Sequence, residues 1–141
     1  MKILIVSSEI IKNKYSASIR VSKILKEVSK QHSVDLITEP MSVFDFEHSL
    51  QDIYITNYKI PFSNKKTLVE KIFSKYLKIS LKHRKRYNAF INKLKSIDVD
   101  KYDMIMALGG GGFFEPLEAV SKFETKAKTI GFIHDPYPGD V

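Results

Sequence analysis

Two short motifs in this sequence combine residue types that bind polar ligands. The first is the glycine run that follows the apolar segment Met104–Leu108. Glycine lets the backbone approach a ligand closely, and the N–H groups at the start of a following helix can hold a sugar hydroxyl or a phosphate. The same run also serves as a tight turn with no ligand. The residues leave both interpretations open for Gly109, Gly110, Gly111 and Gly112.

The second motif is His134-Asp135, directly after the apolar segment Thr129–Ile133. Histidine exchanges a proton near neutral pH, and an adjacent aspartate can orient the ring or accept a hydrogen bond from a sugar hydroxyl. Asp135 also precedes Pro136, and Asp-Pro pairs favour turns, so a purely structural role is the alternative. His134 and Asp135 are the candidate catalytic residues.

The start of the first predicted helix contributes three further candidates for substrate binding. Ser16 or Ser18 can cap this helix, because a serine oxygen accepts a hydrogen bond from an N–H of the first turn. Arg20 lies one turn further on and can bind a phosphate through two parallel hydrogen bonds, or can simply face solvent. No triphosphate-binding loop of the Gly-x-x-x-x-Gly-Lys-Ser/Thr type is present, and the Gly-x-Gly-x-x-Gly dinucleotide motif is missing after the first strand.

The elements that would position these residues alternate between strand and helix. Apolar runs predict strands, and apolar residues at helical spacing predict helices between them. The predicted strands are Lys2–Val6, Ser33–Thr38, Ile53–Thr56, Met104–Leu108 and Thr129–Ile133; the predicted helices begin near Ser16, with Val21, Ile24, Leu25 and Val28 on the core face, lie within Lys65–Lys95, and span Phe114–Phe123. This alternation predicts one α/β domain over residues 1–141, a Rossmann-like three-layer α/β/α fold with a parallel sheet.

Ligands of such sheets bind beyond the carboxyl ends of the strands. We therefore expect the segments Ser7–Arg20, Gly109–Phe113 and His134–Pro138 to share one functional edge. The chain contains no cysteine, which excludes disulfides and thiolate metal sites, and we predict no metal site. The N-terminus does not resemble a signal peptide and no run is long enough to span a membrane, so the expected location is the cytoplasm.

Positive charge is concentrated in the segment Lys65–Lys95. It contains eleven Lys or Arg and one acid, so it carries +10, more than the net +7 of the whole chain. Lysines between apolar stripes suit a helix that lies on an anionic membrane surface, or equally a surface helix whose cations face water. The predicted membrane-surface residues are Lys75, Lys78, Lys82, Arg84, Lys85 and Arg86. Nucleic acid is a weaker alternative and is not expected, because no RNA- or DNA-binding motif is present.

Four segments, in this order, resemble the N-terminal domain of GT-B glycosyltransferases, above all glycosyltransferase family four. They are K-I-L-I-V-S, S-A-S-I-R-V-S-K-I-L-K-E-V, S-V-D-L-I-T and F-I-H-D-P-Y-P, and they span nearly the whole chain. The resemblance implies a sugar-transferring enzyme with two Rossmann-like domains that face each other across a cleft. The N-terminal domain mainly binds the acceptor, and the C-terminal domain holds most of the nucleotide-sugar.

The resemblance also implies roles for particular residues. The His-Asp pair after the fifth strand, here His134-Asp135, reaches the transferred sugar or the acceptor, and the turn after the first strand approaches the donor phosphates, although here that turn has no glycine. The donor-binding domain is absent from these 141 residues, so we expect the chain alone to be inactive. We expect no cofactor besides the nucleotide-sugar substrate, a polysaccharide or lipid-linked acceptor, and peripheral attachment at the inner membrane face.

A flavodoxin-like binding or signalling module without catalysis is the alternative. A receiver-type module needs an acidic pair after the first strand to hold a metal ion, and an aspartate at the end of the third. This chain has Ser7-Ser8-Glu9 and Ile53-Tyr54-Ile55-Thr56 at those positions. The sequence therefore favours the glycosyltransferase interpretation.

Overall fold

The computed structural model describes residues 1–8, 16–40, 49–58, 81–110 and 114–134. Strands and helices alternate along the described chain, as the sequence predicts. In order they are β1 (Lys2–Ser7), α1 (Ser16–Gln31), β2 (Ser33–Thr38), β3 (Leu50–Ile55), α3 (Leu81–Lys95), β4 (Met104–Gly110), α4 (Glu115–Ser121) and β5 (Lys128–His134).

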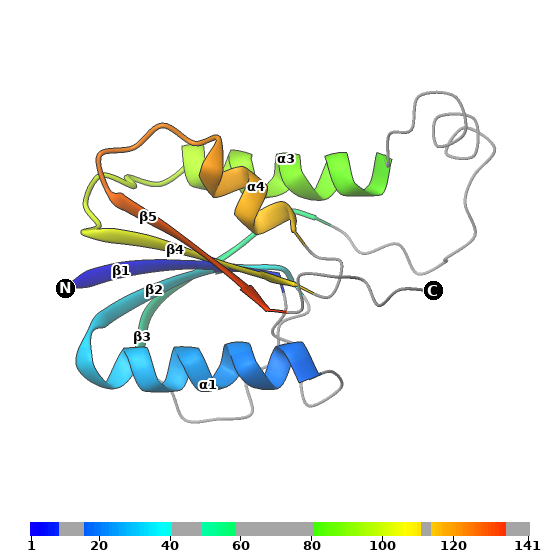
Figure 1. The fold of residues 1–141 in the computed structure, drawn as a ribbon. Helices are drawn as coiled ribbons and strands as arrows, with labels where there is room; N and C mark the ends of the chain where they lie inside the picture. Colours follow the sequence, from blue (N-terminus) through cyan, green and yellow to red (C-terminus); the bar gives the residue numbers. More distant parts are fainter. Residues whose placement is uncertain (9–15, 41–48, 59–80, 111–113, 135–141) are drawn as a thin grey trace.

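The strands form a single parallel sheet with the order β3-β2-β1-β4-β5. Helix α1 covers one face of this sheet, and α3 and α4 cover the other (Figure 1). The fold is therefore α/β with three layers and is Rossmann-like, which confirms the predicted fold class. The strand order is that of doubly wound dinucleotide-binding sheets, in which the order reverses beside the first strand.

Each face of the sheet has its own apolar core. On the α1 face, Val21 and Leu25 are fully buried against Ile3, Ile5 and neighbouring strand residues, and Ile24 and Val28 pack beside them. This confirms the predicted core face of the first helix. Each fully buried side chain of this size contributes about 1.5–3 kcal/mol to folding.

The opposite core joins α3 and α4 to the sheet. Phe90 and Leu94 of α3 are fully buried and pack with Leu4, Val6, Ile37 and Ala119. Helix α4 is short, but Pro116 in its first turn and the acidic residues Glu115 and Glu118 favour a helix start. A Cβ on Gly131 would lie 3.0 Å from Leu117 Cδ2, so glycine allows α4 to pack closely on β5.

The predicted boundaries of several elements differ from the observed ones, for example α4, which spans Glu115–Ser121 and not Phe114–Phe123, and two further differences matter most here. Strand β3 begins at Leu50 rather than Ile53, because Leu50 pairs with Val34 across an irregular register and the Asp52 N–H donates to Asp35 Oδ1 at 3.3 Å. The sequence pattern did not predict this extension, because Gln51 and Asp52 are polar and exposed at the edge of the sheet. Strand β4 extends through Gly110, so Gly109 and Gly110 belong to a strand and not to a loop. They remain extended because β5 pairs with them along its last residues.

Candidate functional site

The carboxyl ends of the strands bring two of the sequence motifs together. Gly110 of β4 is the register partner of His134 of β5, and Gly109 is the partner of Ile133. Ser7, the last residue of β1, is paired with Leu108, directly before the glycines. The glycine run and the histidine therefore meet at one edge, beside the position between β1 and β4 where the strand order reverses. Asp135, Gly111 and Gly112 lie outside the described residues.

Helix α1 begins at the same edge of the sheet (Figure 1). Ser16 is its first residue, and Arg20 follows with an exposed side chain. Ser18 lies inside the first turn, so the prediction that it could cap the helix is wrong. The three candidates are therefore on the expected side of the domain. Lys75 and Lys78, two of the predicted membrane-surface residues, lie outside the described part of the chain.

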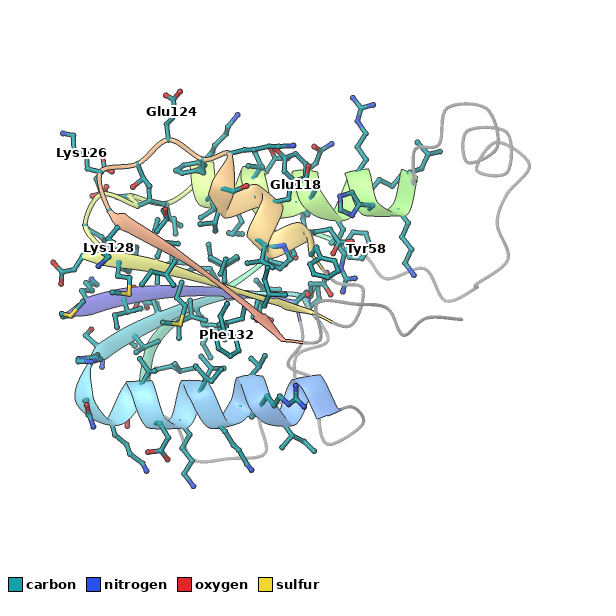
Figure 2. The ribbon with its side chains drawn as sticks, viewed as in Figure 1. Tyr58, Glu118, Glu124, Lys126, Lys128 and Phe132 are labelled. Carbon is teal, nitrogen blue, oxygen red and sulfur yellow. The ribbon has the colours of Figure 1, made fainter. Side chains whose placement is uncertain are left out.

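A buried ion pair that the sequence interpretation missed lies at this edge. Arg86 Nη2 donates to Glu39 Oε2 at 2.6 Å, and Arg86 Nε donates to Glu39 Oε1. The guanidinium also lies 5.7 Å from the centre of the Tyr58 ring, and Figure 2 shows Tyr58 at the end of the molecule opposite Lys126 and Lys128. Glu39 follows β2 and Tyr58 follows β3, so Arg86 connects α3 to the ends of two strands.

A chain of ionisable side chains continues from this pair onto α4. Arg86 Nη1 lies 4.0 Å from Glu115 Oε2, and His83 Nδ1 lies 3.3 Å from Glu115 Oε1. The other ring nitrogen of His83 lies 2.6 Å from Glu118 Oε2, and Lys122 donates to Glu118 Oε1 at 2.5 Å. Through His83 and Arg86, these contacts join α4, the helix that follows the glycine run, to α3.

The environment raises the pKa of Lys122, chiefly through its hydrogen bond to Glu118, and also shifts the pKa values of Arg86 and Glu118. Burial acts to lower the pKa of Arg86, but the hydrogen bonds and charge of Glu39 outweigh it, and the net pKa is above the ordinary arginine value. The pKa of Glu118 is lowered, first by the hydrogen bond from Lys122 and second by the one from His83. Arg86 and Glu118 therefore stay charged at neutral pH.

One predicted membrane-surface residue is wrong. Arg86 is only 6% exposed and points into the protein toward Glu39, whereas Lys82, Arg84 and Lys85 are exposed. Helical spacing contained the signal, since Arg86 precedes Phe90 by four residues and Leu94 by eight and so shares their buried face. Glu39 carried a weaker signal, an acid between an apolar strand and a proline.

A second polar network lies toward the amino ends of the strands and holds the sheet together. The Tyr102 hydroxyl donates to Asp35 Oδ2 at 2.5 Å, and Asp35 is fully buried in β2. Burial and then the bond to Asp35 raise the pKa of Tyr102 far above its ordinary value. Lys101 Nζ lies 3.9 Å from Asp35 Oδ2 and over the Tyr102 ring. This network lies away from the carboxyl edge of the sheet and links β2 to the chain that leads into β4.

Among the described residues, no group of three or more His, Cys, Asp or Glu side chains is arranged to hold a metal ion. Within the same residues, none of the helices combines the length and apolar character needed to cross a membrane. No protein-family model matches the chain, and no curated protein matches it either.

Proposed function

We propose that this chain is the N-terminal, acceptor-side half of a GT-B-type glycosyltransferase. The full-length enzyme would transfer a sugar from a nucleotide-sugar to a polysaccharide or lipid-linked acceptor. The observation that carries the proposal is the pairing of Gly110 with His134 at the carboxyl edge of a Rossmann-like sheet. It supports a ligand site at the edge where such sheets bind their ligands, and the resemblance of the sequence motifs supplies the reaction class.

The strand order favours this proposal over a flavodoxin-like module. Flavodoxin-like sheets have the order 2-1-3-4-5, with the first strand between the second and the third. Here β1 lies between β2 and β4, and β3 is at the edge. The order of the described strands is therefore that of the dinucleotide-binding group.

In the proposed reaction the N-terminal half acts by positioning and by electrostatic stabilisation. Sugar transfer passes through a cation-like state, and fixed polar groups near the sugar lower its free energy. His134 and Asp135 are the candidates for this contact. Ser16, Ser18, Arg20 and the glycines are the candidates for holding substrate. We do not propose that His134 acts as a general base.

The exposed cations of α3 support a peripheral contact with an anionic membrane at the cytoplasmic face. Lys82, Arg84 and Lys85 are exposed near the start of this helix, whereas Arg86 is buried. The enzyme would then bind a lipid-linked acceptor at the same membrane surface to which it is attached. Three cations give reversible and salt-sensitive attachment, since each contributes about 1 kcal/mol at most.

A transfer assay tests the proposal. The full-length protein is incubated with nucleotide-sugars carrying a labelled sugar, in separate UDP and GDP series, together with lipid and polysaccharide extracts. We expect label in the acceptor fraction with at least one donor, and release of the matching nucleotide. If every donor stays intact, and no label reaches either acceptor class, the chain does not belong to a glycosyltransferase.

A further inference from the structure

Three buried side-chain oxygens at the carboxyl edge have no hydrogen-bond partner among the described residues. They are Ser8 Oγ, Thr56 Oγ1 and Glu115 Oε2. Ser8 and Thr56 are each 2% exposed, and Glu115 is 4% exposed. A buried polar atom without a partner destabilises the folded protein, so three of them at one edge require an explanation.

The sheet register places two of these residues in one row. Val6 pairs with Ile37, and Ile37 pairs with Tyr54. The residues two positions further on, which directly follow the ends of β1, β2 and β3, are Ser8, Glu39 and Thr56. Side chains alternate along a strand, so these three face the same side as Val6, Ile37 and Tyr54. That side is the one covered by α3 and α4, because Val6, Ile37 and Tyr54 pack with Phe90 and Leu94.

The row continues onto β4 and contacts α4. Ser7 pairs with Leu108, so continuing the register places Ser8 beside Gly109. The carboxylate in the middle of the row, Glu39, is held by Arg86, which in turn lies 4.0 Å from Glu115 Oε2. A polar layer of Thr56, Glu39, Ser8 and Gly109 thus lies above the apolar core, and Glu115 contacts it through Arg86.

The chemistry of this layer discriminates between ligands. Hydroxyl groups both donate and accept hydrogen bonds, whereas a carboxylate accepts only, so the unpartnered oxygens suit a ligand rich in O–H donors. Phosphate is disfavoured because two carboxylates, Glu39 and Glu115, accompany a single buried guanidinium that Glu39 already engages. Two strand spacings, about 10 Å, separate Thr56 from Ser8, a span that suits a ligand larger than one phosphate group.

We propose that Ser8, Thr56 and Glu115 bind the hydroxyl groups of a saccharide, the acceptor-side sugar of the reaction. The inference rests on the proposed function for the identity of this sugar and on the polar layer for its place. Because the three oxygens are buried, each hydrogen bond to them forms away from water, where it is stronger. The site binds a sugar ring, and other residues bind the phosphates of the donor.

The test is a backbone amide NMR titration of the full 141-residue chain. Glucose, galactose, mannose and N-acetylglucosamine are added separately to tens of millimolar, with inorganic phosphate as the comparison. We expect saturable shifts at the amides of Ser8, Thr56 and Glu115 with at least one sugar, and none there with phosphate. Saturable shifts with phosphate at these amides, or with no sugar at all, overturn the site.

Variants separate a ligand site from a structural one. Ser8→Ala and Thr56→Val should weaken sugar binding at least tenfold, with Tm unchanged or raised, because neither hydroxyl has a partner in the folded protein. Thr56→Ser keeps the hydroxyl and should bind as the wild type does. Ser121→Ala is the control, since Ser121 is exposed at the end of α4 that lies away from the polar layer.

Two outcomes overturn the site. One is unchanged sugar binding in Ser8→Ala and Thr56→Val, and the other is a fall in Tm of several degrees, which would identify the hydroxyls as structural donors. The transfer assay of the full-length protein is independent of both. Transfer without binding at these residues rejects the site alone, whereas sugar binding here without any transfer rejects the proposed function.

Discussion

Arg86 and Glu39 form a buried, bidentate ion pair that joins α3 to the chain directly after β2. The side chains of both residues are almost completely buried. The desolvation of two buried charges offsets much of their mutual attraction, so the net stabilisation from such a pair is small. Its main effect is to fix the relative position of the two segments that it joins. What it constrains here is the position of α3 over the strand ends, next to Glu115 and the glycine run.

Removal of one member of this pair should destabilise the protein strongly. In Arg86→Met the Glu39 carboxylate stays buried without its partner, and we expect a loss of about 3–5 kcal/mol in the free energy of unfolding, measured by urea denaturation. The double variant Arg86→Met with Glu39→Leu should recover much of this loss. Arg84→Met, on the exposed side of the same helix, should change stability by about 0.5 kcal/mol or less. Equal effects of the two single variants would contradict the buried pairing.

The carboxylate of Glu118 should make stability depend on pH. Its pKa is lowered in the folded protein from the ordinary value of 4.5, by Lys122 first and His83 second. A lowered carboxyl pKa contributes stability above pH 4.5, and this contribution is lost as the pH falls through the folded-state pKa. The Tm difference between wild type and Glu118→Gln should therefore be positive near pH 7 and shrink towards zero in acid. A difference that grows in acid would show that Glu118 is not stabilised as a carboxylate.

The Tyr102 hydroxyl should stabilise the sheet through Asp35. In Tyr102→Phe the buried Asp35 carboxylate loses its 2.5 Å donor while the ring packing stays. We expect a loss of about 1–3 kcal/mol, measured by urea unfolding. Tyr54→Phe is the comparison: its hydroxyl lies 3.3 Å from both Asp52 Oδ2 and Lys101 Nζ, in exposed contacts, and its loss should destabilise the protein less. A Tyr102→Phe protein as stable as the wild type would show that the hydrogen bond from Tyr102 to Asp35 does not stabilise the fold.

The sequence predicted the layers of the fold well because its strands and first helix have regular apolar patterns. Val21 and Leu25 at helical spacing, and the apolar run of β1, allow few other arrangements. The start of β3 could not be read from the pattern, because Gln51 and Asp52 are polar on an edge strand. The extension of β4 into Gly109 and Gly110 depends on pairing with β5, a contact far away in the sequence.

The candidate site was predicted only where strand ends determine it. Position after a strand was enough to place His134, Gly109 and Gly110 at one edge. Composition could not distinguish Arg86 from its neighbours in the run His83–Arg86, because a count of charges ignores which side of a helix each one occupies. Glu115 and Thr56 become candidates only when it is known that both are buried and that Glu115 Oε2 and Thr56 Oγ1 lack a hydrogen bond.

The proposed membrane contact should depend on the exposed cations of α3 and not on Arg86. In a triple variant, Lys82, Arg84 and Lys85 are changed to glutamate, and Arg86 is kept so that the fold survives. We expect the wild type to sediment with anionic vesicles at low salt and to be released at high salt, and the variant to stay in solution. Changing the exposed lysines Lys23, Lys26 and Lys30 of α1 to glutamate gives the same charge change on the other face of the sheet. Equal loss in both variants, or equal binding to neutral vesicles, would contradict a directed contact.

The most direct test of the central claim is the rate of sugar transfer by His134→Ala in the full-length protein. His134 ends β5 beside Gly110, so its loss should lower kcat by about 100-fold or more while Tm stays within a few degrees of the wild type. Lys128→Ala, at the opposite end of the same strand, is the control and should transfer sugar at the wild-type rate. A His134→Ala enzyme whose kcat lies within twofold of the wild type would contradict the assignment of this strand edge as the reaction site.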